Sequence, residues 1–481
     1  MKWVVELLKD HLPSVLDDLG YTSKTGGTAS LVIAASNSPQ VFKNRADYQC
    51  DGVQDQVEIN AAIASLTSTS GSIFLAQGDY YIDSAILFPW NDLIIRGCGI
   101  STVIIRSADQ TFNMLELGDR WGIVLQDFCI HGNGDGAGYT TPCVGVYIDD
   151  GENLRIRNIS FMYIPGSSGG DGIFVRTAGI PGTPQNVLVT DCKFLAIGDD
   201  AIDINLAQYW TVSNCIFSSI GDNGIDTDGS KHCNFIGNHF NYCDYGIELE
   251  DEGVAWTEYC TVIGNTFANC TEAIHILSGR YNTICGNSID DGTWGITLGF
   301  DQSSENESNY NVLTGNFISN CTYGIEEMDG EADHNLIADN KYFNISSTEE
   351  IISGANTSNP QHPDQVNAVA DTNSSSTTFV LIDGMTVTPG TGQYMVMFSS
   401  SIECMEPDTE QFAILYVGGS PVAHTERKID TEASLANTSF PISIQALVSV
   451  TNAAHAIEVR WKCPTGDQMT CHQRTLVVKR I

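Results

Sequence analysis

The chain has 481 residues, enough for two or three domains. Asp and Glu number 59 against 22 Lys and Arg, a formal net charge of -37, which argues against nucleic acid or an anionic membrane surface as a partner. No apolar run approaches the ~20 residues that a membrane span needs, so membrane insertion is not expected. Such an acidic chain would suit a salty medium or bound divalent cations.

Residues 1–28 are expected to form a separate helical segment. Residues 1–20 read as a short amphipathic helix, because Glu6, Lys9 and Asp10 interrupt what would have to be the apolar core of a secretion signal. A chain acting outside a cell would then leave it by another route, after processing, or as part of a virion.

Residues 29–350 are predicted to form one elongated domain that opens with a helix. Apolar residues stand near helical spacing between Val57 and Leu66, and the acidic residues Asp55 and Glu58 near the start favour a helix N-terminus. A helix at this place would cover the open end of a β-solenoid, whose strand edges otherwise invite aggregation.

A repeat of roughly 22 to 28 residues runs from Gln185 to about Asn340 and predicts such a solenoid. Large apolar residues that recur once per copy should point inward, because only the stacked coils exclude water. One such column contains Ile202, Ile225, Ile247, Ile274, Ile296 and Ile325. A second contains Phe194, Phe217, Phe240, Phe267, Ile289 and Ile318.

A third column is mostly asparagine. It contains Cys192, Cys215, Asn238, Asn265, Asn287, Asn316 and Asn340. Buried amides at this spacing can hydrogen-bond from coil to coil. A simple turn signal would explain any one Gly-Asn pair. It explains poorly why several copies keep the amide at the same offset, so we favour a ladder.

The residue after each column isoleucine should point outward, since side chains alternate along a strand. In order these residues are Phe174, Asp203, Asp226, Glu248, His275, Thr297 and Glu326. Two positions further on the same face come Arg176, Asn205, Asp228, Glu250, Leu277, Gly299 and Met328. The columns predict an acidic patch over three coils, made of Asp203, Asp226, Asp228, Glu248 and Glu250, with Arg176 and His275 beside it.

Stacked carboxylates in this patch would repel one another. Neighbouring coils lie ~4.8 Å apart, and at an effective dielectric constant of 20 two carboxylates at ~5 Å repel by roughly 3 kcal/mol. The patch must therefore raise a pKa, hold a cation, or splay toward solvent. One outward Asp is usually plain surface, whereas five acids on contiguous coils favour catalysis or metal binding.

Residues 351–376 are predicted to be a polar linker and residues 377–481 an antiparallel β-sandwich, because apolar alternation returns after the linker.

Of the 15 cysteines, Cys243, Cys270 and Cys321 occupy inward positions and are expected to be buried free thiols. Cys463 and Cys471 flank a turn in a predicted hairpin, where a disulfide would fit. No Cys/His spacing predicts a zinc site, and no metal ligand is assigned.

The repeat resembles the right-handed parallel β-helix proteins of the pectate-lyase-like superfamily over roughly residues 70 to 350. Its entry helix and the two strand signals after it, 71–75 and 78–82, look like the entry of many β-helix proteins, including viral tailspikes. The C-terminal pattern, notably 411–419, is similar to trimeric jelly rolls of the tumour-necrosis-factor and complement type, which implies a homotrimer. A monomeric carbohydrate-binding sandwich is the alternative for this domain.

These resemblances imply chemistry on glycans. Glycosidases that retain configuration hold their two carboxyls ~5 Å apart, and those that invert hold them ~6.5–9.5 Å apart. Asp203 and Asp226 fit the first spacing, and Asp203 and Glu248 fit the second. Inversion is favoured because the β-helix hydrolases that the chain resembles usually invert. The predicted catalytic residues are therefore Asp203, Asp226 and Glu248, and the predicted substrate-binding residues are Arg176, Asp228, Glu250 and His275.

A narrower motif match is incomplete. Residues 198–202, Gly-Asp-Asp-Ala-Ile, resemble the Gly-Asp-Asp motif of polygalacturonases, and 223–229 echo their Asn-Thr-Asp element. The Gly-His-Gly and Arg-Ile-Lys elements of that family are missing, which puts polygalacturonase activity in doubt. A Ca2+-dependent lyase would use the acids as ligands and Arg176 or Arg280 as base, and it ranks below a hydrolase because basic residues are scarce.

The leading hypothesis is an all-β, trimeric, viral tailspike-like protein at the virion tail. In it the N-terminal segment binds tail or baseplate proteins, the β-helix binds a host surface glycan, and the sandwich trimerises or binds a receptor. Whether the glycan is also hydrolysed stays open, no cofactor is required, and Ca2+ is an option. The alternatives are a secreted or cell-surface polysaccharide hydrolase or lyase, and a non-catalytic structural or adhesive surface protein.

Overall fold

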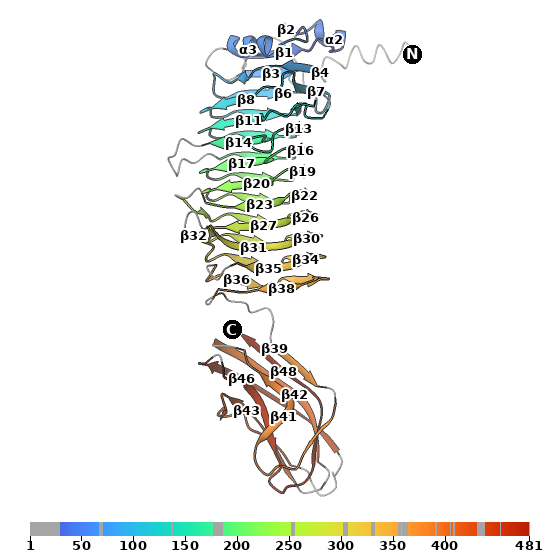
Figure 1. Cartoon of the computed structure of the whole chain (residues 1–481), viewed down its shortest axis with the longest axis vertical. Helices are drawn as coiled ribbons and strands as arrows, with labels where there is room; N and C mark the ends of the chain where they lie inside the picture. The colour runs from blue at the N-terminus through green and yellow to red at the C-terminus, as the bar shows by residue number, and fades with distance from the viewer. Residues whose placement is uncertain are drawn as a thin grey trace, which may run out of the picture. The chain divides into compact units, whose positions relative to one another are not determined.

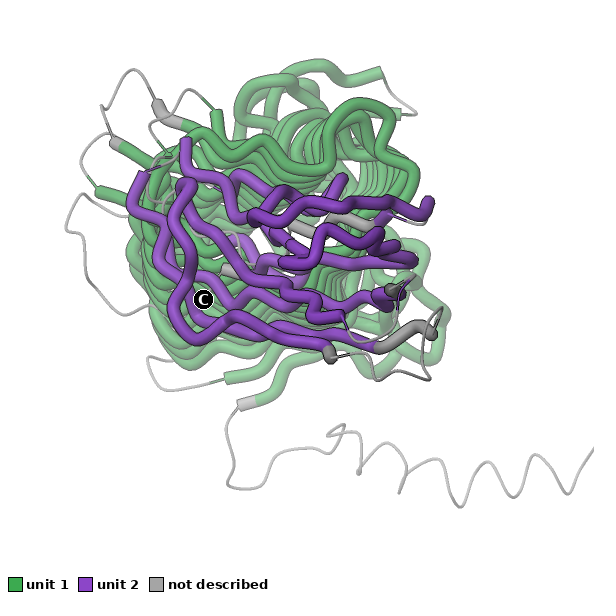
Figure 2. The backbone as a smooth tube through the Cα atoms, turned by 90° about the horizontal axis from the view of Figure 1, so that it is seen from below, with its two compact units in different colours: residues 1–336, 340–357 green, residues 337–339, 358–481 purple. Residues whose placement is uncertain are grey.

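The computed structural model describes residues 29–480 except 67–70, 136–137, 177–185, 252–254, 302–305, 329–331, 355–356, 358–363, 369, 390–391, 405, 407–408, 431–437 and 453. The predicted attachment segment, residues 1–28, lies outside the described residues. Two compact units divide the chain: the first has residues 1–336 and 340–357, and the second has residues 337–339 and 358–481 (Figure 2).

The first unit is a parallel β-solenoid whose coils each add one strand to sheets A, B and C (Figure 1). Sheet A contains β1 (Ala29–Ala34), β2 (Tyr48–Gln49), β3 (Gly71–Leu75), β6 (Leu93–Arg96), β9 (Val124–Gln126), β12 (Arg155–Arg157), β15 (Leu188–Thr190), β18 (Thr211–Ser213), β21 (Asn234–Ile236), β25 (Thr261–Ile263), β29 (Thr283–Cys285), β33 (Val312–Thr314) and β36 (Leu336–Ala338). Sheet B contains β4 (Gly78–Ile82), β7 (Thr102–Arg106), β10 (Cys129–His131), β13 (Ser160–Ile164), β16 (Lys193–Ile197), β19 (Ile216–Ile220), β22 (His239–Asn241), β26 (Thr266–Ala268), β30 (Ser288–Asp290), β34 (Phe317–Ser319) and β37 (Lys341–Phe343). Sheet C contains β5 (Ile86–Leu87), β8 (Asn113–Gly118), β11 (Val144–Asp149), β14 (Ile173–Arg176), β17 (Ile202–Asn205), β20 (Asn223–Asp228), β23 (Tyr245–Leu249), β27 (Glu272–Leu277), β31 (Trp294–Asp301), β32 (Asn306–Glu307), β35 (Tyr323–Glu327) and β38 (Thr348–Ile351). A small parallel pair, β24 (Thr257–Glu258) and β28 (Gly279–Arg280), lies outside the three sheets.

The two predicted apolar columns are confirmed. Ile202 pairs with Ile225, and the same register continues to Ile325, with every member fully buried. In sheet B the rings of Phe194 and Phe217 stack with centroids 4.9 Å apart, and the next two pairs down the column are 4.5 and 4.7 Å apart. These distances match the coil spacing, so each ring fills the core against its two neighbours.

The asparagine ladder is also confirmed. The Oδ1 atom of Asn265 accepts hydrogen bonds from the backbone N–H and the Nδ2 group of Asn238, at 2.9 and 3.1 Å. Its own Nδ2 group donates to the Phe235 carbonyl and to Oδ1 of Asn287. The pattern continues to Asn340, so each buried amide also satisfies a turn backbone group.

A second ladder was not foreseen from the sequence. The Oδ1 atom of Asn282 accepts from the backbone N–H of Cys260, and Asn311 and Asn335 continue the series. All three amides are buried. Each asparagine follows a Tyr or His residue with positive φ, a recurring pair that would have served as the signal.

Replacing a ladder amide should destabilise the solenoid strongly. We expect Asn287→Ala to lower the free energy of unfolding by about 3 kcal/mol, because it leaves buried hydrogen-bonding groups of both neighbouring coils without partners. The exposed neighbour Ser288 provides the control, and Ser288→Ala should change the value by less than ~0.5 kcal/mol. Chemical denaturation of both variants measures the difference. Equal values would exclude a structural role for the ladder.

Two helices precede the third strand of sheet A, namely α2 (Gln40–Lys43) and α3 (Gln56–Ser65). Helix α3 begins after Asp55 as predicted, buries Ile59 and Ile63, and packs against strands β1, β2, β4 and β5 (Figure 1). Val57, counted in the predicted apolar set, is 57% exposed. The helix is therefore present, while its function as a cap on the solenoid stays a prediction. No helix among the described residues has the length and apolar character of a membrane span.

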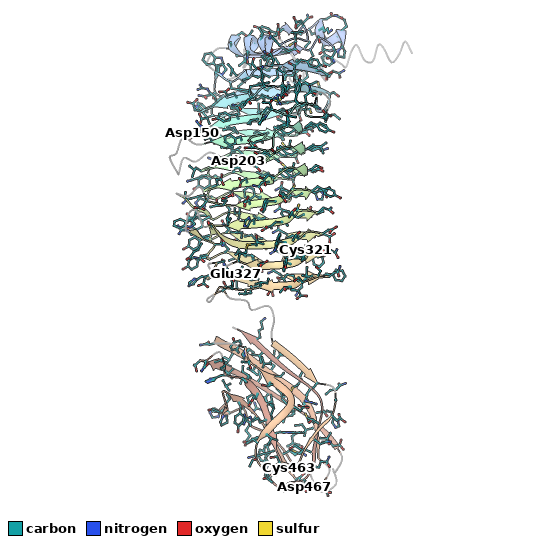
Figure 3. All side chains as sticks on the ribbon, in the orientation of Figure 1. Asp150, Asp203, Cys321, Glu327, Cys463 and Asp467 are labelled. Atoms are coloured by element: carbon teal, nitrogen blue, oxygen red, sulfur yellow. The ribbon has the colours of Figure 1, made fainter. Side chains whose placement is uncertain are left out.

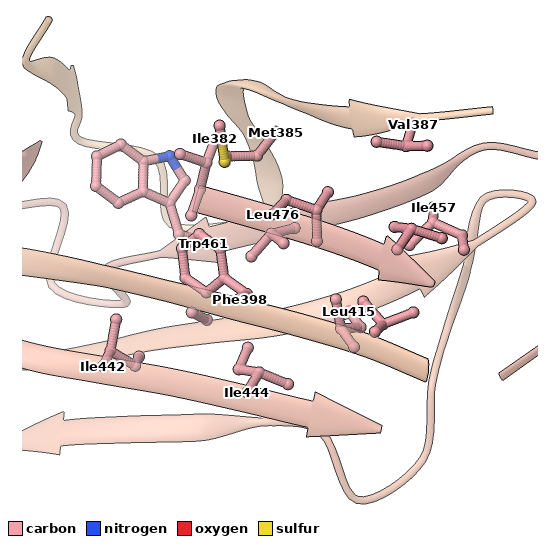
Figure 4. Close-up of a cluster of buried hydrophobic side chains, with 14 of the residues drawn as sticks. Ile382, Met385, Val387, Phe398, Leu415, Ile442, Ile444, Ile457, Trp461 and Leu476 are labelled. Atoms are coloured by element: carbon pink, nitrogen blue, oxygen red, sulfur yellow. The ribbon is translucent and has the colours of Figure 1, made fainter. Parts of the chain in front are cut away.

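The second unit contains two antiparallel sheets, D and E. Sheet D contains β39 (Asp364–Ala368), β40 (Thr372–Ser374), β42 (Gly392–Cys404), β46 (Thr438–Val450) and β48 (Met469–Arg480). Sheet E contains β41 (Val380–Val387), β43 (Glu410–Val417), β44 (Ser420–Pro421), β45 (Arg427–Asp430) and β47 (Ile457–Lys462). Both sheets contribute to one hydrophobic core around Trp461, Phe398 and Leu476, as a β-sandwich would (Figure 4). The jelly-roll topology and trimerisation stay predictions.

Two predictions for this unit need correction. Strands β39 and β40 lie within the predicted linker 351–376 and pair with β48, so part of that segment belongs to sheet D. The predicted disulfide is also wrong, since Cys463 and Cys471 are free buried thiols. Cys463 follows a strand of sheet E and Cys471 lies in sheet D, so the turn between them joins two sheets and is not a hairpin. The predicted free thiols Cys243, Cys270 and Cys321 are confirmed.

Candidate active site

The predicted acids meet on or directly after three adjacent strands of sheet C, and His275 lies on the next strand. The register pairs Asp203 of β17 with Asp226 of β20. Asp228 forms a bridge with Glu250, and Glu248 of β23 pairs with His275 of β27. The alternation of each strand places these side chains on the face opposite the isoleucine column. Asp203 is labelled in Figure 3 on the side of the solenoid where the strands of sheet C are drawn.

The acids form two overlapping groups. Carboxylate oxygens of Asp203, Asp226 and Asp228 lie within 4.8 Å of one another, and so do those of Asp226, Glu248 and Glu250. Asp226 belongs to both groups and is 9% exposed, and Glu248 is 7% exposed. The predicted alternation is confirmed: these side chains lie on the face of sheet C opposite the isoleucine column. Asp226 and Glu248 nevertheless do not splay into solvent, because they are buried among the other acids. The remaining three, Asp203, Asp228 and Glu250, are half-buried.

Hydrogen bonds fix the edges of the cluster and leave its centre open. Nδ2 of Asn223 donates to Glu248 Oε2 at 2.9 Å, and Nδ1 of His275 lies 2.8 Å from Glu248 Oε1. Nδ2 of Asn205 donates to Asp203 at 2.6 Å. In contrast, the buried Oδ1 atom of Asp226 has no hydrogen-bond partner among the described residues. An unpartnered buried oxygen in this position calls for a proton, a cation or a ligand.

The electrostatics follow from this packing. Burial, followed by repulsion from Asp228 and Asp203, raises the pKa of Asp226 well above its ordinary value. Burial, followed by repulsion from Asp228 and Asp200, does the same to the pKa of Asp203. Repulsion from Asp228 acts on both carboxyls, so the cluster titrates as a linked group, and a linked group of this kind can share a proton.

His275 supplies positive charge at one side. Burial opposes its protonation, but the contact with Glu248 and the charge of Glu272 outweigh burial and raise the pKa of His275. Nδ1 of His275 and Oε1 of Glu248, 2.8 Å apart, form an ion pair whenever the imidazole is protonated. His275 also stacks on Tyr245, with ring centroids 5.5 Å apart, so its orientation is fixed.

A second acidic group adjoins the first and was not among the predicted site residues. Carboxylate oxygens of Asp171, Asp199 and Asp200 lie within 4.8 Å of one another. Burial is the main cause that raises the pKa of Asp171 to about 7 and that of Asp200 to about 8. Burial likewise raises the pKa of Glu272 to about 7. The Gly-Asp-Asp motif at 198–200 was the sequence signal for this group.

Arg176 is the predicted residue that the structure sets apart. It is exposed at the end of β14, and its register partner on β11 is Asp149. The residue of β14 that pairs with Asp203 is Phe174, not Arg176. Arg280, considered as a lyase base, lies against the ring of Trp256 at 3.6 Å and pairs with Glu258. A guanidinium held by a carboxylate and an aromatic ring is poorly suited to accept a proton.

Comparison with known proteins agrees with the architecture. Residues 141–265 match the family described as right handed beta helix region. The pre-neck appendage protein of Bacillus phage B103 is 24% identical over 283 residues, which cover 53% of this chain and 32% of that protein. The chain thus spans about a third of the length of that relative.

Two solved structures are also similar. The A-module of the mannuronan C-5 epimerase AlgE4 of Azotobacter vinelandii is 15% identical with a TM-score of 0.45, covering 64% of this chain and 96% of that one. The enzymatically active domain of tailspike protein 2 of bacteriophage CBA120 is 13% identical with a TM-score of 0.44, covering 88% and 74%. The matched residues 141–265 lie within the three parallel sheets of the solenoid, which is the architecture that the description of the family gives.

Proposed function

We propose that the chain is a viral tailspike-like protein that binds and hydrolyses a host cell-surface polysaccharide. The observation that carries the proposal is the pair of half-buried Asp203 and buried Asp226 on one face of a β-helix, in which Oδ1 of Asp226 has no hydrogen-bond partner among the described residues. The similarity to a phage appendage protein supports the viral setting. In this setting residues 1–28 attach the chain to tail or baseplate proteins, and the protein acts outside the host cell.

The proposed reaction uses the shared proton of the pair. Asp226 is the more buried group, and in its protonated form it donates a proton to the glycosidic oxygen as the bond to the anomeric carbon breaks. Ionised Asp203 attacks that carbon, and water activated by deprotonated Asp226 then releases the sugar from Asp203. Carboxylate oxygens within 4.8 Å favour this retaining course over the inversion expected from sequence.

The remaining predicted residues would bind and orient the substrate. Glu248 and His275, in contact at 2.8 Å, would lie beside the reacting pair and orient the substrate. Asp228 and Glu250 continue the same face toward the ends of their strands and can accept hydrogen bonds from sugar hydroxyls. Arg176 would contact the substrate only at the exposed edge of the site.

Incubation with envelope polysaccharide from candidate hosts tests the proposal. The expected result is the release of oligosaccharides with saturated ends, and the anomer formed first, followed by NMR, should have the configuration of the substrate. Unsaturated ends would indicate a lyase. If no oligosaccharide is released from any host glycan, the hydrolase proposal is lost. Native mass spectrometry tests the proposed homotrimer separately, and a monomer would count against a tailspike-like protein.

A bound divalent cation is the second candidate for the same residues. Two overlapping groups of three carboxylates offer oxygen ligands of the type that Ca2+ prefers. A bound cation would neutralise the acids that otherwise share a proton. Cation binding and protonation of the cluster are therefore alternatives, because a cation lowers the pKa values that burial and repulsion raise. This candidate implies binding or lyase chemistry in place of hydrolysis.

A further inference from the structure

A notch interrupts one corner of the solenoid next to the acidic site. Each strand of sheet B from β13 onward has one residue with φ between 52° and 61°, either just before the end of the strand or directly after it. In register these residues are Tyr163, Ala196, Ser219, Tyr242, Asn269, Asp291, Asn320 and Asn344. Two consecutive coils therefore have a small side chain, flanked on both sides by tyrosine.

Ala196, one residue before the end of β16, is an unexpected residue at such a position. Left-handed backbone is disfavoured for residues other than glycine, and Asn and Asp tolerate it best because their side chains can hydrogen-bond locally. The later coils of the same column follow this rule with Asn269, Asp291 and Asn320. Ala196 has φ 54° and no such compensation. Backbone strain of this kind persists where the small side chain serves a function.

The small residues open a groove of about 620 Å³. Its walls are mainly apolar and include Tyr163, Pro165, Ile197, Ile220 and Tyr242. The two tyrosines stand three coils apart, a separation of ~14 Å at the ~4.8 Å coil spacing. Tyr242 is 60% exposed, so its ring is available to a ligand. The volume lies within the range of sites that hold small organic ligands, ~300–1,000 Å³.

The groove residues adjoin the acidic residues along the chain. Gly198, on the groove wall, directly precedes the acidic pair Asp199 and Asp200, and Gly221 directly precedes Asp222. A polymer longer than the groove would therefore extend toward the strands of sheet C that carry the acids. Aromatic rings with nearby hydrogen-bond acceptors suit sugar rings, which present apolar C–H faces and polar hydroxyl edges.

The charges decide which class of sugar fits. Carboxylate oxygens of Asp171, Asp199 and Asp200 lie within 4.8 Å of one another, and Asp199 directly follows the groove residue Gly198, so a further negative charge beside them would be repelled. Burial and repulsion from Asp199 raise the pKa of Asp171, in agreement with this packing. An anionic polymer such as a polyuronate would add to this repulsion. An uncharged glycan would not, and its hydroxyls can donate to the carboxylates.

We propose that the notch between Tyr163 and Tyr242 binds sugar rings of an uncharged polysaccharide and sets specificity against polyuronates. The proposal rests on the glycan hydrolysis proposed above and names its substrate class. The rings lie between the tyrosines over Ala196 and Ser219, and the polymer continues from there onto the acids of sheet C.

The test measures binding to Asp226→Asn, which prevents turnover. The probes are hexamers of glucose, galactose, mannose and N-acetylglucosamine, and hexamers of galacturonate and mannuronate. In isothermal titration at least one neutral hexamer should bind, and the uronate hexamers should bind at least about tenfold more weakly. Tyr242→Ala and Ala196→Asn should each weaken the neutral ligand about tenfold, or ~1.4 kcal/mol.

Ala196→Asn is informative because it fills the notch with a residue that its backbone favours, so the melting temperature should stay equal or rise. Tyr310→Ala removes an exposed tyrosine with φ 59° from the turn before β33, and binding should not change. The proposal is overturned if no neutral hexamer binds, if uronate hexamers bind equally well, or if the two notch variants bind like the parent. If the neutral hexamer binds and the notch variants weaken it, but wild type hydrolyses no glycan, only the hydrolase proposal is rejected. If wild type hydrolyses a glycan and the notch variants neither slow hydrolysis nor weaken binding, only the notch proposal is rejected.

Discussion

Asp226→Asn is expected to lower the rate of oligosaccharide release by about 10²–10⁴-fold, the range for loss of a general acid. An amide has nearly the shape of a protonated carboxyl but cannot deliver its proton. Because Asp226 is buried with its pKa raised, the neutral amide should also be tolerated by the fold, and the melting temperature should stay equal or rise. The measurement is the initial rate on host polysaccharide together with thermal unfolding.

Asp203→Asn should reduce the rate by a similar factor, because the two groups act as one pair. The double variant with both substitutions should then be about as slow as either single variant, because the two effects are not additive. Asp291→Asn is the matched control, since Asp291 is exposed, lies on a turn and accepts Asn without strain. If Asp226→Asn releases oligosaccharides at the wild-type rate, Asp226 is not the general acid, even though it is buried.

Stability should fall as the pH rises from about 4 to about 8. In the unfolded chain Asp171 and Asp200 have ordinary pKa values of 3.8, whereas the folded protein raises them to about 7 and about 8. Between these values the folded state binds more protons than the unfolded state, so stability decreases with pH. This contribution is complete below pH 4 and is lost as the pH passes the folded values. For Asp200 it is worth on the order of 5 kcal/mol.

Denaturation at pH 5 and pH 8 measures this effect, with Asp200→Asn as the diagnostic variant. The variant cannot ionise at this position, so its difference between the two pH values should be smaller by several kcal/mol. A larger or equal difference would mean that Asp200 is not a source of the pH dependence. Adding Ca2+ at pH 8 tests the alternative, because a cation bound only by the folded state raises stability by mass action. No response at millimolar Ca2+ would reject the cation site.

The solenoid and its columns were predictable because the same inward position must recur in every coil. Ile202 and Phe194 each begin a column whose register the structure reproduces, and the Asn265 ladder follows from the same period. The second ladder through Asn311 was equally periodic and was overlooked. The same reasoning failed in the second unit, where Cys463 and Cys471 lie close in sequence but belong to different sheets. No local pattern records which sheet a strand will join.

The sequence by itself determined the β-helix, its inward columns and the gathering of acids on one face, because a repeated coil turns sequence position directly into place on the surface. Only the tertiary structure decided the state of those acids. Burial separates Asp226, whose pKa is strongly raised, from exposed Arg176, although both were assigned to the same face. It also added Asp171 and Asp200 to the site and opened the notch at Ala196. Burial, pKa and cavity shape depend on what packs over a residue from other coils, and that information is not carried by the residue or its repeat.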